Sequence, residues 1–162
     1  MRTRLATLDD AEALRTIYNA EVIGSTVTFD LVPRSVADQE AWLRRHAGAY
    51  PAVVSVDDGG NVTGFGSLSP YRERPAYATT VESSVYVDAA HRKLGVGKLL
   101  LDDLILLATK HGFHAMIARA VGDNGPSIAL HQRCGFELVG VEHEVGRKFG
   151  QWLDVAVLQR QL

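Results

Sequence analysis

The chain carries the stretch His91-Arg92-Lys93-Leu94-Gly95-Val96-Gly97-Lys98, called here the glycine loop (residues 91–98), between two apolar runs. The run before it alternates like a strand, and the run after it has the spacing of a helix. A strand that turns through glycines into a helix places several backbone N–H groups at a helix N-terminus, where the aligned peptide dipoles favour negative charge. The stretch therefore predicts a phosphate site.

Two common nucleotide motifs are excluded by single positions in and just after this loop. A Walker loop requires Gly where Arg92 stands and Ser or Thr where Leu99 stands. A dinucleotide fingerprint requires a third Gly where Leu100 stands. The pattern that remains is Arg-x-x-Gly-x-Gly, which belongs to neither class of nucleotide-binding protein.

Composition limits the class of protein. The 162 residues are 46% hydrophobic and 22% charged, with a net charge of -2. These values predict one domain over residues 1–162, with a core that needs neither disulfides nor metals, and they give no reason to expect nucleic acid or an anionic membrane as partner. Cys134 is the single cysteine, and no run has the length of a signal peptide or a membrane span. We therefore expect a cytoplasmic protein.

Apolar periodicity and turn residues predict a regular order of elements. The predicted strands are residues 2–6, 52–56, 62–68, 77–87, 113–121, 136–145 and 152–159. The predicted helices begin at Thr7 or Asp9, at Ser35, after the glycine loop and at Asn124, and end near residues 20, 47, 110 and 135. This β-α-α-β-β-β-α-β-α-β-β order predicts an α/β (α+β) fold with a mixed sheet and helices on both of its faces.

Four stretches together carry a resemblance to a known family. They are the glycine loop, Thr-Val-Glu-Ser-Ser-Val-Tyr-Val (80–87), Ala-Leu-His-Gln-Arg-Cys-Gly-Phe (129–136) and Val-Gly-Arg-Lys-Phe-Gly-Gln-Trp-Leu-Asp (145–154). The chain resembles the GNAT N-acetyltransferases along essentially its whole length, and within them the phosphinothricin and methionine sulfoximine N-acetyltransferases. The resemblance implies a mixed, mostly antiparallel central sheet of about seven strands flanked by four helices. It also implies acetyl-CoA as co-substrate, no metal, and a small amino-acid-like amine as acceptor.

Glu82 and His131 are the predicted catalytic residues. Strand alternation places Glu82 on one face with Ser84 and Tyr86, and burial in a cleft would raise its pKa, as a base for the substrate ammonium requires. The alternative interpretation is a solvated carboxylate or a structural ion pair. Many GNAT proteins have Tyr at the position of His131, where it is thought to protonate the CoA thiolate. The imidazole either donates that proton or helps to deprotonate the amine, and the alternative is a packed or surface histidine.

The resemblance also assigns cofactor-binding residues. The glycine loop would approach the pyrophosphate through its backbone at Gly95 and Gly97, with charge from Arg92, Lys93 and Lys98, whereas the alternative is an ordinary helix cap. Splaying of the preceding strand would expose the backbone of Tyr86 and Val87 to pantetheine. The full predicted set is Tyr86, Val87, Arg92, Lys93, Leu94, Gly95, Val96, Gly97, Lys98, Asn124 and Ser127.

Acceptor recognition is expected from the variable loops. The predicted residues are Phe29, Arg72, Arg74, Tyr77 and Lys148, with an arginine pairing a substrate carboxylate or phosphinate. Residues 147–149 contribute either to the site or to a homodimer contact, or else form a hairpin turn. Direct attack by the amine is expected, because Cys134 is predicted to be buried and not an acyl carrier. Two alternatives stay open: a different amine (a polyamine, an aminoglycoside or a protein N-terminus), and a non-catalytic acyl-CoA binding module.

Overall fold

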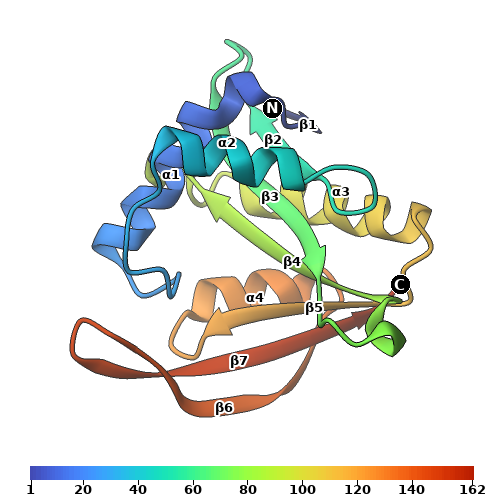
Figure 1. Cartoon of the computed structure of the whole chain (residues 1–162). Helices are drawn as coiled ribbons and strands as arrows, with labels where there is room; N and C mark the ends of the chain where they lie inside the picture. The colour runs from blue at the N-terminus through green and yellow to red at the C-terminus, as the bar shows by residue number, and fades with distance from the viewer.

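The computed structural model describes all 162 residues (Figure 1). The strands are β1 (Arg2–Leu5), β2 (Ala52–Val56), β3 (Val62–Pro70), β4 (Thr80–Val87), β5 (Ala115–Val121), β6 (Glu137–Lys148) and β7 (Gln151–Gln161). The helices are α1 (Ala11–Gly24), α2 (Val36–Arg45), α3 (Val96–Lys110) and α4 (Gly125–Arg133), and three short 3₁₀ turns cover Leu8–Asp10, Pro75–Tyr77 and Ala89–His91. No helix is both long enough and apolar enough to cross a membrane.

The seven strands form one sheet in the order β1-β2-β3-β4-β5-β7-β6. Every neighbouring pair is antiparallel except β4 and β5, which are parallel. The predicted α/β class, element order and mixed, mostly antiparallel sheet with four helices are therefore confirmed. The strand β7 lies between β5 and β6, so the sheet order does not follow the chain order at this end.

Local sequence explains where most helices begin and end. The Ser35 side chain accepts a hydrogen bond from the Asp38 N–H while the Asp38 carboxylate accepts one from the Ser35 N–H, a reciprocal cap for α2. Gly95 precedes α3 with φ 85°, and Gly112 follows its end with φ 84°. These left-handed conformations favour glycine because a Cβ is strained there.

Three predicted boundaries were wrong by three or four residues. Tyr77 is not in a strand but in the turn Pro75–Tyr77, because the proline at its start has no N–H to give to a sheet ladder. Helix α1 continues to Gly24 instead of ending near residue 20. Lys148 lies in β6 and not in a turn, since it pairs with Gln151.

Helices cover the two faces of the sheet unequally. One core cluster joins α3 and the end of α4 to strands from β2 across to β7. The other joins α1 and α2 to β2, β3 and Tyr86 of β4, and it contains no residue of β5, β6 or β7. In Figure 1, α1 and α2 lie on one side of the sheet over its β1–β4 half, and α3 lies on the other. On the α1/α2 side, the part of the sheet formed by β5, β7 and β6 is called here the helix-free face.

Candidate functional site

Strands β4 and β5 separate part of the way along the sheet. Their ladder pairs Thr80 through Ser83 with Ala115 through Ala118 and then stops, although β4 continues to Val87. Figure 1 shows the two strands diverging from this point. The backbone of Tyr86 and Val87 is thus paired with β3 on one side and with no strand on the other. This is the splay that the resemblance implied.

The glycine loop follows directly and presents unpaired backbone donors. No N–H group from Arg92 to Lys98 donates a hydrogen bond within the chain. Lys93 has φ 62° and Gly95 φ 85°, the backbone conformation in which successive N–H groups form an anion-binding concavity. At the N-terminus of α3 the helix dipole adds to that preference for an anion.

Two of the three charges expected to support an anion are already paired inside the chain. The Arg92 guanidinium pairs with Glu21 at the end of α1. The Lys98 ammonium lies 2.5 Å from the Asp102 carboxylate, which raises the pKa of Lys98. Lys93 has no ion pair, and the Leu94 side chain is exposed. A Cβ on Gly97 would lie 3.0 Å from Leu130, so this glycine also lets α3 approach α4.

The predicted residues of α4 are brought together by its cap. The Asn124 side chain accepts a hydrogen bond from the Ser127 N–H, and the Ser127 carbonyl oxygen lies 2.8 Å from Nδ1 of His131. His131 is 5% exposed and its ring meets Phe136 edge-on. Burial lowers the pKa of His131, opposed by the hydrogen bond to Ser127.

Glu82 lies beside the β4–β5 separation. It pairs in register with Ser69 of β3 and Ile117 of β5. Val81 and Ser83 on either side of it are buried toward α3, so Glu82 points to the α1/α2 side. It shares that side with Tyr86, as the strand alternation predicted. Burial raises the pKa of Glu82, which Arg119 opposes and Glu142 reinforces. A carboxyl group held in this way is better suited to take a proton than one in bulk water.

The charged neighbours of Glu82, Arg119 on β5 and Glu142 on β6, were missed by the sequence reasoning. They form an ion pair with Nη1 of Arg119 3.3 Å from Glu142 Oε2. The available signal was Arg119 itself, a charge inside the otherwise apolar run Ala-Met-Ile-Ala-Arg-Ala-Val.

The loop between α1 and α2 (residues 25–35) reaches the β6–β7 hairpin. The Phe29 ring packs on Gly146 so closely that a Cβ there would lie 2.3 Å from Phe29 Cε2. The buried Lys148 ammonium donates hydrogen bonds to the carbonyl oxygens of Thr28 (2.8 Å) and Glu21 (3.5 Å). Lys148 therefore engages the backbone of this loop, and burial lowers its pKa.

Arg72, Arg74 and Tyr77 share an open depression of about 490 Å³ with Glu73. The Arg72 guanidinium lies 5.0 Å from the centre of the Tyr71 ring and 5.6 Å from that of Tyr77. Neither Glu82 nor His131 lines this depression. The structure thus groups these three predicted acceptor residues with one another but not with Phe29 or Lys148.

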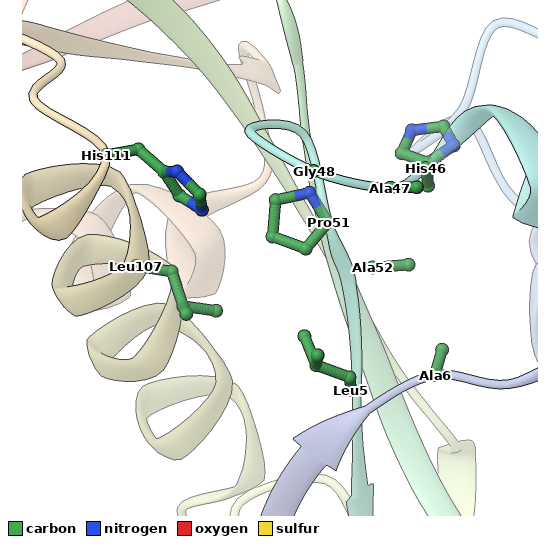
Figure 2. A pocket seen from close by; sticks show the side chains of 9 residues that line it. All are labelled: Leu5, Ala6, His46, Ala47, Gly48, Pro51, Ala52, Leu107 and His111. Atoms are coloured by element: carbon green, nitrogen blue, oxygen red, sulfur yellow. The ribbon is translucent and has the colours of Figure 1, made fainter.

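A second cavity, of about 270 Å³, lies between the ends of α2 and α3 and the first two strands. Figure 2 shows its lining, with His46 and His111 on opposite sides of Pro51. It contains none of the predicted site residues.

Comparison with known proteins agrees with this geometry. Residues 12–136 match the model of the Acetyltransferase (GNAT) family. The L-methionine sulfoximine/L-methionine sulfone acetyltransferase of Pseudomonas paraeruginosa is 38% identical over 160 residues, which cover 98% of this chain and 93% of that protein.

Two solved structures have the same fold. A GNAT superfamily phosphinothricin acetyltransferase from Sinorhizobium meliloti, in complex with acetyl-CoA, superposes with a TM-score of 0.95 at 38% identity, covering 99% of this chain and 87% of that one. A ribosomal-protein-alanine N-acetyltransferase from Brucella melitensis gives a TM-score of 0.97 at 34% identity, covering 100% of both chains. The chain therefore belongs to the GNAT family of acetyltransferases and is an acetyl-CoA-dependent N-acetyltransferase.

Proposed function

We propose that the protein transfers the acetyl group of acetyl-CoA to the primary amine of a small amino-acid-like acceptor, such as phosphinothricin, methionine sulfoximine or a related compound. The observation that carries the proposal is the position of Glu82, a carboxyl group whose pKa is raised by burial, beside the gap between β4 and β5. The names of the relatives supply the acceptor class.

In the proposed reaction the amine attacks the thioester carbonyl directly. Glu82 accepts a proton from the acceptor ammonium, either directly or through a water molecule, and the free amine forms a C–N bond with the acetyl carbon. The C–S bond then breaks, the new amide nitrogen releases its second proton, and the departing CoA thiolate takes up a proton. The unpaired N–H groups of residues 92–98 bind the pyrophosphate. The backbone groups of Tyr86 and Val87 pair with pantetheine, and Asn124 and Ser127 lie beside the pantetheine.

The hydrogen bond of His131 bears on its role in this reaction. A carbonyl oxygen only accepts, so Nδ1 of His131 carries the hydrogen in its contact with Ser127. With its pKa lowered, the ring is neutral at neutral pH and its Nε2 is then a proton acceptor. These two features favour His131 as a group that receives a proton before it supplies one to the thiolate.

The acceptor side of the site is proposed to include Phe29, Arg72, Arg74, Tyr77 and Lys148. The contact of Phe29 with Gly146 supports a wall formed by the α1–α2 loop. Lys148 supports that wall through its bonds to Thr28 and Glu21. Arg72 and Arg74 lie in an open depression, where an anionic group of the acceptor has access to both.

The proposal extends to a cytoplasmic homodimer. The β6–β7 hairpin carries six exposed apolar side chains, Leu138, Val139, Val141, Val145, Phe149 and Trp152. Exposed apolar side chains on and beside the edge strand β6 support pairing with a second copy. Light scattering after gel filtration tests the homodimer directly, and a monomeric mass would contradict it.

The experiment that tests the function follows free-thiol release from acetyl-CoA over a panel of amino acids, sulfoximines, phosphinothricin, polyamines, aminoglycosides and alanine-ended peptides. Turnover with the amino-acid-like compounds is expected. Turnover confined to polycations or to peptide N-termini would assign a different acceptor, and acetyl-CoA binding without any turnover would identify a non-catalytic module.

A further inference from the structure

Arg119 is an unusual residue for its place in the sheet. It lies in β5, between β4 and β7, and the other six residues of this strand are buried. A guanidinium in an interior strand keeps its charge only where one face of the sheet admits water or another charged group. The side chain is 34% exposed, so it reaches such a face.

The strand registers identify this face as the one that carries Glu82. Glu82 pairs with Ile117, and Arg119 is two residues further along β5, on the same side of the sheet. Arg119 in turn pairs with Val157 of β7, so it points to the helix-free face, away from the cluster under α3. The opposing effects of Arg119 and Glu142 on the pKa of Glu82 agree with this closeness.

The present partner of Arg119 is exchangeable. Glu142 touches it through one nitrogen and one oxygen at 3.3 Å, and both side chains are about one-third exposed (34% and 39%). Partly exposed ion pairs of this kind contribute little free energy, because water screens them. A carboxylate that meets the guanidinium with both oxygens makes the stronger, bidentate contact.

An amino-acid acceptor brings such a carboxylate to this place. Its amine has to reach Glu82, and its carboxylate is attached to the carbon that bears the amine. Two carboxylates near one another repel, so a cation on the same face is required to hold the substrate beside the base. We propose that Arg119 binds the acceptor carboxylate and that Glu142 holds the guanidinium until the substrate displaces it. This assignment rests on the proposed function and adds a residue to its acceptor site.

The test compares an acceptor that the wild type acetylates with its carboxamide, which keeps the amine and loses the negative charge. The quantity measured is the ratio of kcat/KM for the acid to kcat/KM for the carboxamide, so that any general effect on Glu82 cancels. Arg119→Met should lower this ratio about 10- to 100-fold, the size expected for a lost charge-assisted pair. Arg119→Lys should give a smaller fall, and Glu142→Gln should raise the ratio because the competing carboxylate is gone.

Controls separate this inference from the proposed function. Arg72→Met is measured in parallel, and thermal unfolding with acetyl-CoA affinity verifies that each variant folds. A ratio in Arg119→Met within twofold of wild type, or an equal fall for acid and carboxamide, overturns the role of Arg119 while the acetylation of amino acids stands. A wild type that acetylates no carboxylate-bearing amine overturns both.

Discussion

The Lys148 ammonium at the end of β6 donates a hydrogen bond to the carbonyl oxygen of Thr28, 2.8 Å away. The two residues are 120 positions apart in sequence, and Lys148 is 3% exposed. This hydrogen bond connects the α1–α2 loop, which carries Phe29, to the β6–β7 hairpin. One wall of the proposed acceptor site thus depends on a side chain from the opposite end of the chain.

Replacement of Lys148 by Met should loosen this wall. The carbonyl of Thr28 would lose its buried donor, and we expect a loss of about 1–3 kcal/mol in the free energy of unfolding. The KM of the acceptor should rise several-fold while the affinity for acetyl-CoA is retained. Arg147→Met is the matched control, because Arg147 is exposed and its guanidinium lies over Trp152. Denaturant unfolding and steady-state kinetics distinguish the two variants. Similar behaviour of both would argue against a stabilising role for the Lys148–Thr28 hydrogen bond.

Gly146→Ala should displace Phe29. The added Cβ would meet the Phe29 ring at 2.3 Å, and since the ring belongs to a loop side chain, the loop is expected to move before the sheet does. The expected result is a several-fold higher acceptor KM with little change in melting temperature. Gly140→Ala in the same strand is the control, because no atom lies within 4 Å of its added Cβ. Equal kinetics for the two variants would exclude Phe29 from the acceptor site.

Glu82→Gln should separate activity from stability. We expect kcat to fall about 10²- to 10⁴-fold with acetyl-CoA affinity retained, and wild-type kcat/KM to fall as the pH drops through the raised pKa of Glu82. Because the folded pKa is above the unfolded one, the folded state binds the proton more tightly, so stability declines as pH rises between the two values. The variant should therefore gain melting temperature over wild type at pH 7–8 but not near pH 4. An unchanged kcat would remove Glu82 as the base.

His131→Phe should have the opposite pH signature. The pKa of His131 is lowered in the folded protein, so its neutral form contributes stability that is present above the unfolded pKa and is lost as pH falls through the folded one. Wild type should therefore lose stability relative to the variant between pH 7 and pH 5. The kcat of the variant should fall about 10- to 10³-fold, as expected for a lost proton-transfer group. NMR titration of the ring measures its pKa, and a value above 6.5 would contradict the buried, neutral histidine.

The sequence by itself determined the parts of the molecule that depend on neighbours in the chain. The cap of α2 needs only Ser35 and Asp38, and the turn into α3 needs only the left-handed Gly95. The face of Glu82 follows from the two-residue period of a strand. Motif spacing along the chain likewise identified the GNAT family.

The tertiary structure alone decided which distant side chains meet. Arg119 on β5 meets Glu142 on β6 because both strands pair with β7, an order that no local pattern encodes. Lys148 was expected in a turn, yet its buried ammonium holds Thr28, and Arg92 pairs with Glu21 across 71 residues. Such contacts follow from the packing of whole elements, whereas propensity and period act over a few residues. The acetyltransferase family was therefore predictable from the sequence, whereas the shape and charge of the proposed acceptor site are formed only by folding.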